Sequence, residues 1–280
     1  MIPISSRIAF LMVEHCKIRM GGSVPVRIDK DGDVVRETPI QAERLACLML
    51  GPGTSISHDA IKAFANAGCL VLWTGEHGVR VYSTGHPGGA SGTHILRQAE
   101  MILDPRKRLL TARRLYARMM GQEPPANRST DQLRGLEGVW VRNRYAELAK
   151  LHDVPWGGRN QKSSDPANRA ISMATSTLYG VTEAAILALG YSPALGIVHS
   201  GDPRSFVFDV SDTVKFRTVV PLAFEMVAYG QQPTHGDGKD IAGVVRRACR
   251  DLFFREKLMT LLVTIIQEIM EDAVVGDIAD

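Results

Sequence analysis

The chain has no apolar run long enough to cross a membrane and no N-terminal segment of the secretory type. Its apolar stretches fall short of the roughly 20 residues that a transmembrane helix needs. The first residues, MIPISSRIAFLMVEH, lack both a charged start and a small-residue cleavage site. We therefore expect a cytoplasmic protein that has no membrane partner.

Cysteine is scarce, and no two cysteines form a CxxC pair. The chain holds Cys16, Cys47, Cys69 and Cys249, which lie far apart in the sequence. Structural zinc sites and disulfide frameworks show closer, paired spacing. We expect reduced thiols inside the core.

Several enzyme motifs are absent as well. The sequence contains no GxSxG, HExxH or GxGxxG motif. GPGTSIS (51–57) resembles a phosphate-binding loop but lacks the GK[ST] ending of a Walker A motif. These absences argue against a serine hydrolase, a zincin, a dinucleotide-binding enzyme and a P-loop enzyme.

The composition that is present is that of a mildly basic globular protein. Of 280 residues, 45% are hydrophobic and 22% charged, and the formal net charge is +3. This length is enough for one large or two modest domains. The charge permits a polyanionic partner without requiring one.

The first part of the chain has the pattern of a β-rich domain with one helix. KDGD (30–33) supplies the turn of a hairpin, and Ser57 and Gly68 bound the helix expected within 55–68. We predict strands over 7–15, 24–29, 34–38, 45–50, 69–73 and 79–83.

A stretch rich in glycine and proline, TGHPGGASGT (84–93), then separates this region from a helical one. We predict an α+β protein: a β-sandwich-like domain over 1–84, a linker over 85–93 and an all-α catalytic domain over 94–280. Helices are expected over 104–121, with Asp104 as N-cap, and over 129–152, which begins with a capping box of Ser129 and Gln132. Further helices are expected over 167–190, from near Asp209, and within 246–274, the last stretch as one or two.

Asp209 and Asp212 form the first candidate site. At the start of a helix, a spacing of three puts both carboxylates on one face, where they repel each other. Three arrangements resolve the repulsion: capping of the helix N-terminus, ion pairs with Lys215 or Arg217, or a shared divalent cation. Taken alone, the pair favours capping or solvation.

His199 and Glu137 are two further candidates. His199 ends an apolar run, where a histidine is commonly a satisfied turn residue. Glu137 lies on the apolar stripe of its helix, and its ordinary interpretation is a salt bridge to a nearby arginine. Taken together with the two aspartates, these residue types suit Mg²⁺ or Mn²⁺, and the histidine favours tolerance of Mn²⁺. Such a site acts on phosphoryl groups.

Basic residues lie close in sequence to these candidates. Each group alone is typical of a solvated helix face, but with an acidic metal site they suit a phosphodiester substrate. They are Arg106, Lys107, Arg108, Arg113, Arg114, Arg118, Arg142, Arg144, Arg204, Lys215, Arg217, Arg246, Arg247 and Arg250.

Five stretches resemble the CRISPR-associated integrase of the spacer-acquisition machinery, the first CRISPR-associated protein family, in its type I-E branch. They are MLGPGTSISHDA (49–60), VLWTGEHGVRVYSTGHPGGA (71–90), QLRGLEGVWVR (132–142), ATSTLYGVTEAAILALGYSPALGIVHSGDPRSFVFDVSDTVKF (174–216) and RRACRDLF (246–253). The resemblance implies a metal-dependent DNA endonuclease and integrase. It would insert short duplex DNA beside the CRISPR leader by 3′-hydroxyl transesterification, as a homodimer working with a small partner protein.

The resemblance also implies roles for single residues. Glu137, His199 and Asp209 match the family's metal ligands, and Asp212 matches an acidic residue that supports them. The positions expected to contact DNA are Arg80, Tyr179, Lys215, Arg246 and Arg250.

The chain departs from the family pattern at a few positions. His15 stands where relatives carry a tyrosine that brackets the duplex end, and Ser55 and Lys62 stand where arginines are expected. The tail after Glu271 is short and acidic. Two other functions stay open: a nuclease that hydrolyses branched DNA, and a non-catalytic DNA-binding subunit whose acids only cap helices.

Overall fold

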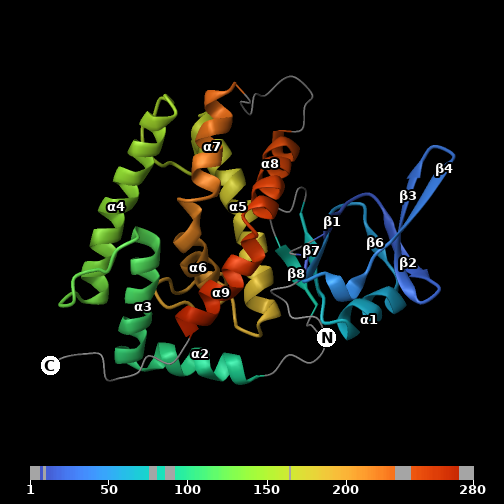
Figure 1. Ribbon diagram of the computed structural model, residues 1–280, viewed down its shortest axis with the longest axis horizontal. Helices are drawn as coiled ribbons and strands as arrows, with labels where there is room; N and C mark the ends of the chain where they lie inside the picture. Colours follow the sequence, from blue (N-terminus) through green and yellow to red (C-terminus); the bar gives the residue numbers. More distant parts are fainter. Residues whose placement is uncertain are drawn as a thin grey trace.

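The structure is a computed structural model that describes residues 7–8, 11–75, 81–85, 92–163, 165–230 and 241–270 (Figure 1). Arg80, most of the predicted linker and the acidic tail after Glu271 lie outside these residues.

A mostly parallel sheet lies beside the helical part of the molecule. β1 (Leu11–Val13), β5 (Cys47–Leu50) and β7 (Leu70–Thr74) run parallel, and β8 (Val81–Thr84) pairs antiparallel with β7. β5 and β7 are continuous apolar runs because the sheet is covered on both faces.

A second sheet extends away from the helices (Figure 1). Its strand order is β4 (Val34–Pro39), β3 (Val24–Asp31), β2 (Lys17–Gly21) and β6 (Ser55–Ile56). Side chains of both sheets share one core with α1 (His58–Asn66), whose N-terminus the Ser57 hydroxyl caps as predicted. A 3-10 turn over Ala42–Arg44 precedes β5.

The helical part packs around α5. Its elements are α2 (Thr93–Leu103), α3 (Pro105–Met120), α4 (Thr130–Leu151), α5 (Pro166–Ala188), α6 (Ser205–Lys215), α7 (Val219–Ala228), α8 (Ile241–Arg255) and α9 (Leu258–Met270). Apolar and small side chains are buried along nearly the full length of α5, and Figure 1 shows the other helices arranged around it. The predicted capping box of Ser129 and Gln132 begins α4.

The two parts are joined by a common core. Cys47, Met49, Leu70 and Leu72 of the parallel sheet belong to the same buried cluster as the side chains of α5. The predicted α+β class is therefore confirmed, with sheets first and helices after. The predicted domain limits stay a prediction, and Thr93, the last residue of the predicted linker, already begins α2.

Some predicted elements are wrong in their bounds. The strand predicted over 7–15 ends at Val13, because the chain turns at His15, whose φ is +51°; Ile8 already pairs with Leu45 in the same parallel register as β1 with β5. The helix expected within 55–68 begins at His58, directly after its predicted cap Ser57, and the first residues of that stretch, Ser55 and Ile56, pair with β2 instead. The last helical stretch, predicted within 246–274 as one or two helices, is two, which break at Lys257 (φ +48°), and α8 already begins at Ile241.

Two further outcomes concern composition. All four cysteines are buried free thiols, as predicted. No helix among the described residues is long and apolar enough to span a bilayer.

Candidate active site

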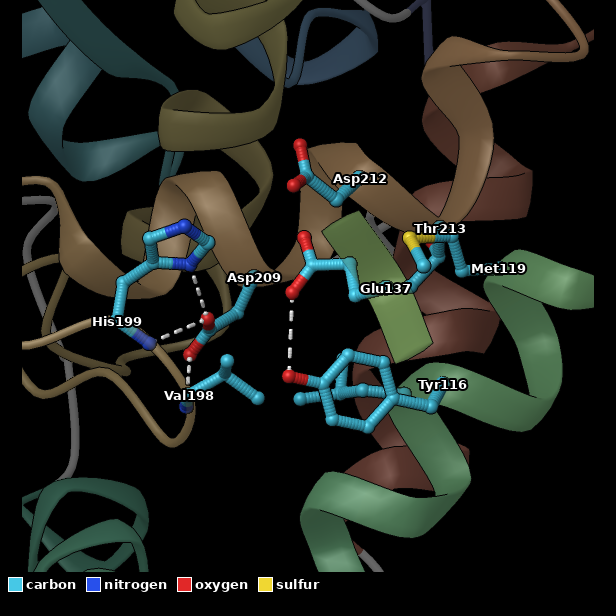
Figure 2. A pocket seen from close by; sticks show the side chains of 9 residues that line it. Tyr116, Met119, Glu137, Val198, His199, Asp209, Asp212 and Thr213 are labelled. Atoms are coloured by element: carbon cyan, nitrogen blue, oxygen red, sulfur yellow. Dashed lines mark hydrogen bonds and ion pairs between the residues drawn. The ribbon is translucent and has the colours of Figure 1, made fainter. Parts of the chain in front are cut away.

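Three helices and one loop meet at a small pocket that holds the predicted acids and histidine (Figure 2). Tyr116 and Met119 come from α3, Glu137 from α4, and Asp209, Asp212 and Thr213 from α6; the loop before α6 adds Val198 and His199. The fold therefore brings together Glu137, His199, Asp209 and Asp212, which span more than seventy residues of sequence.

Asp209 is completely buried, and its carboxylate is saturated with hydrogen bonds. Oδ2 accepts the backbone N–H groups of Ile197 (2.5 Å) and Val198 (3.1 Å). Oδ1 accepts the backbone N–H (3.0 Å) and the ring Nδ1 (2.8 Å) of His199. A carboxylate offers about four lone-pair sites, and all four are used. Asp209 thus acts as the anchor of the 197–199 loop.

The capping interpretation of the two aspartates is wrong. α6 begins at Ser205, one turn before Asp209, and its N-terminal residue Arg204 gives no side-chain cap. The two aspartates lie in the middle and last turns of α6, where one faces the loop and the other faces the pocket (Figure 2).

Two arginines hold the outward carbonyls of the same loop. Arg108 of α3 donates through Nε to the Ile197 carbonyl at 2.8 Å, and Arg134 of α4 donates to the Val198 carbonyl. The loop therefore has its N–H groups fixed by Asp209 and its carbonyl groups fixed by Arg108 and Arg134. This arrangement places His199 without requiring a regular element.

Replacing Arg134 with lysine is expected to lower activity by about tenfold, because the loop that carries His199 loses one of the side chains that hold it in place. Lysine keeps the charge but lacks the guanidinium geometry that reaches the Val198 carbonyl. The measurement is the single-turnover rate together with DNA affinity. Arg128→Lys is the control, since Arg128 is exposed and lies just before α4. Equal loss of affinity and rate would instead make Arg134 a phosphate contact.

The imidazole of His199 is oriented by its bond to Asp209. That bond raises the pKa of His199 above its usual value, while burial opposes it. With Nδ1 donating to the carboxylate, Nε2 of the neutral ring keeps a free lone pair. Figure 2 shows this second nitrogen pointing away from Asp209. The side chain is 39% exposed, so an incoming group can reach it.

Asp212 has a different environment from Asp209. Its Oδ1 lies 2.7 Å from Nζ of Lys215, and both side chains are 13% exposed. This confirms the predicted ion pair, yet Oδ1 is buried and accepts no well-aligned hydrogen bond from a described residue. Burial alone would lower the pKa of Lys215, but Asp212 outweighs it and raises that pKa.

Glu137 makes no salt bridge to an arginine among the described residues. Its Oε2 accepts a hydrogen bond from the Tyr116 hydroxyl at 3.2 Å. Burial, and then the nearby charge of Asp212, raises the pKa of Glu137. Burial and Glu137 likewise raise the pKa of Tyr116, so its hydroxyl keeps the proton and donates it.

The donor set suits a divalent cation, although the site is not assembled for one in this conformation. Among the described residues, no three His, Cys, Asp or Glu side chains converge closely enough to hold a metal ion. Glu137 and Asp212, two partly buried carboxylates that repel each other, and the oriented imidazole of His199 are nevertheless the ligand types that Mg²⁺ and Mn²⁺ accept.

A second, larger hollow adjoins the pocket and contains two residues predicted to contact DNA. Tyr179 and Lys215 line it together with Trp156 and Arg159. Burial, and then Asp212, raises the pKa of Tyr179 to about 12, and its ring lies 5.0 Å from that of Phe208. Both predicted residues therefore lie beside the pocket.

The other residues predicted to contact DNA lie elsewhere. Arg246 of α8 is mostly buried and pairs with Glu14 at 3.2 Å, which ties α8 to the sheet end. Arg250 is 58% exposed and pairs with Asp251. Arg80 lies outside the described residues.

Sequence reasoning missed Tyr116, which lines the pocket, and also Arg108 and Arg134, which bind the loop that carries His199. Arg108 stands among the basic residues noted as possible phosphate contacts, whereas Arg134 does not, and no local pattern indicates that either side chain binds a backbone carbonyl. Tyr116 carried no signal beyond its position on the buried stripe of α3.

Comparison with known proteins decides the family. The family model described as CRISPR associated protein Cas1 matches residues 14–123 and 116–255. The chain is a member of the Cas1 family. The CRISPR-associated endonuclease Cas1 of Geobacter sulfurreducens and that of Escherichia coli K12 are each 44% identical to it over 274 residues. The alignments cover 96% of this chain and 86% and 87% of those proteins.

Solved structures of the Cas1 family agree with the fold. A structure described as the TtCas1-DNA complex superposes with a TM-score of 0.74 and 36% identity, covering 94% of this chain and 97% of that one. A CAS1 protein from Thermotoga maritima gives a TM-score of 0.73 at 16% identity, which supports the fold alone. The type I-E branch stays a prediction.

Proposed function

We propose that this chain is a metal-dependent DNA endonuclease and integrase of CRISPR adaptation. It would insert short duplex DNA at the leader-proximal repeat, as a homodimer assembled with a small partner protein. The observation that carries the proposal is the pocket that Glu137, His199 and Asp212 line together, beside a basic and aromatic hollow. The endonuclease names of the relatives and the DNA complex of one Cas1 structure support it.

The proposal revises the roles that the sequence assigned to the two aspartates. Glu137, His199 and Asp212 would hold Mg²⁺ or Mn²⁺, because each has an oxygen or nitrogen that accepts no well-aligned hydrogen bond from a described residue. Asp209 would position His199, because its four lone-pair sites are used. When bound, the cation supplies charge that polarises a phosphoryl oxygen and activates a hydroxyl nucleophile.

The chain itself supplies positioning and charge. Asp209 fixes the His199 tautomer, and Lys215 balances part of the negative charge of Asp212. Tyr179 and Arg159, in the adjoining hollow, would bind the strand end: an aromatic face stacks on a base, and a guanidinium binds phosphate. No protein nucleophile is needed, since a 3′-hydroxyl or a water can attack the phosphorus.

A metal-dependent joining assay tests this function. Full-length protein, the partner protein and labelled duplex DNA are incubated with a repeat-containing target and Mn²⁺ or Mg²⁺. We expect joined strands that disappear with EDTA and with His199→Ala. A free 5′-phosphate end without joining would show a hydrolytic nuclease instead. DNA binding without cleavage or joining of any strand would instead indicate a non-catalytic DNA-binding subunit.

A further inference from the structure

A hydrogen bond between Tyr116 and Glu137 fixes the orientation of one carboxylate at the pocket. Tyr116 is 3% exposed, and its hydroxyl donates to Oε2 of Glu137 at 3.2 Å. The donor comes from α3 and the acceptor from α4, so the packing of two helices fixes the carboxylate. Figure 2 shows the second oxygen of Glu137 on the side of Asp212.

We propose that Tyr116 is a specificity-determining residue that restricts Glu137 to one-oxygen coordination and so selects Mg²⁺ and Mn²⁺ over Ca²⁺. This inference rests on the proposed function, because it assumes that Glu137 is a metal ligand. The hydrogen bond occupies a lone pair of Oε2 and fixes the orientation of the Glu137 carboxylate. The other oxygen, beside Asp212, stays available to a cation.

Coordination chemistry links this hydrogen bond to ion choice. Ca²⁺ takes six to eight oxygens and commonly binds carboxylates through both oxygens, whereas Mg²⁺ demands about six ligands at shorter distances. The proposed site offers only three protein ligands: one carboxylate oxygen from Glu137, one from Asp212 and the imidazole nitrogen of His199. This is few for Ca²⁺. The nitrogen ligand further favours Mn²⁺ over Ca²⁺. Freeing Oε2 would add the ligand that Ca²⁺ lacks.

The local packing makes the test selective. Tyr116 lies against Leu115 and Met119 on the buried face of α3, so phenylalanine keeps the ring and removes only the hydroxyl. Tyr191 provides a matched control, since it is 5% exposed, stacks on His94 at 4.9 Å and lies outside the pocket.

The experiment is a competition titration followed by the electron paramagnetic resonance signal of free Mn²⁺. Full-length wild type, Tyr116→Phe and Tyr191→Phe each bind Mn²⁺, and Ca²⁺ is then added until the free signal returns. We expect Tyr116→Phe to need about five- to tenfold less Ca²⁺, relative to its Mn²⁺ affinity, than wild type. Tyr191→Phe should match wild type.

An unchanged ratio of Ca²⁺ to Mn²⁺ affinity in a folded Tyr116→Phe variant would overturn the proposal. Wild-type protein that takes up no Mn²⁺ would overturn both the proposal and the metal site beneath it. Infrared difference spectra of wild type labelled with ¹³C-glutamate, with and without Mn²⁺, test the same point without a variant. One-oxygen coordination widens the splitting of the carboxylate stretches, and a narrowed splitting would contradict the inference.

Discussion

Asp212→Asn is expected to lower strand cleavage and joining by at least about a hundredfold, because Asp212 is a proposed metal ligand and such a ligand contributes several kcal/mol to transition-state stabilisation. Asparagine keeps the shape of the side chain and removes its charge. The buried Oδ1 of Asp212 has only Lys215 beside it, so no other described group takes over its role. The Mn²⁺ affinity should fall together with the rate.

The fold should survive this change. Lys215, which is only 13% exposed, loses its partner, but the repulsion between Asp212 and Glu137 is removed as well, so the stability loss is expected to stay below the roughly 3–5 kcal/mol of a broken buried pair. Thermal unfolding and Mn²⁺ titration on the same sample separate the two effects. Asp131→Asn, on the exposed first turn of α4, is the control. A variant that keeps wild-type activity would remove Asp212 from the site.

Asp209→Ala is expected to act mainly on stability, by about 3–5 kcal/mol, which is the cost of removing a buried charge that has several donors. The change leaves the N–H groups of Ile197, Val198 and His199 without their acceptor. Activity falls as well, because the His199 loop loses its anchor. The measurement is the free energy of unfolding in denaturant.

This expectation differs from a role for Asp209 as a metal ligand. If Asp209 only bound the metal, Asp209→Ala would lose Mn²⁺ binding while its unfolding free energy stayed near that of wild type. Asp209→Ala is best compared with Asp212→Ala. We expect Asp209→Ala to be the less stable of the two variants and to keep the higher Mn²⁺ affinity. A more stable Asp209→Ala variant with the lower Mn²⁺ affinity would instead support Asp209 as the metal ligand, as the sequence resemblance implied.

The sequence was sufficient for most of the fold. Ser57, Asp104 and Ser129 cap the helices that their spacing predicted, since capping depends only on residues within one turn. The predicted bounds of helices and strands were wrong where strand pairing between distant segments overrides the local sequence pattern. Ser55 and Ile56 lie in the stretch predicted to hold a helix but join β2 through a pairing that spans 38 residues between Lys17 and Ser55.

The candidate residues could also be found from sequence, because a charge on an apolar stripe needs compensation wherever it lies. Glu137, His199, Asp209 and Asp212 do line one pocket. Their partners could not be found in that way. Glu137 pairs with the Tyr116 hydroxyl instead of an arginine, and nothing local to either residue indicates that contact.

The sequence by itself determined the residue types of the site, the caps and the sheet-then-helix order, because these follow from composition and short-range spacing. Only the tertiary structure decided which aspartate anchors and which faces the pocket. Three residues apart on a helix, they point in directions that differ by roughly 60°. The 197–199 loop occupies one of those directions and α4 the other, so packing between distant segments assigns the two roles.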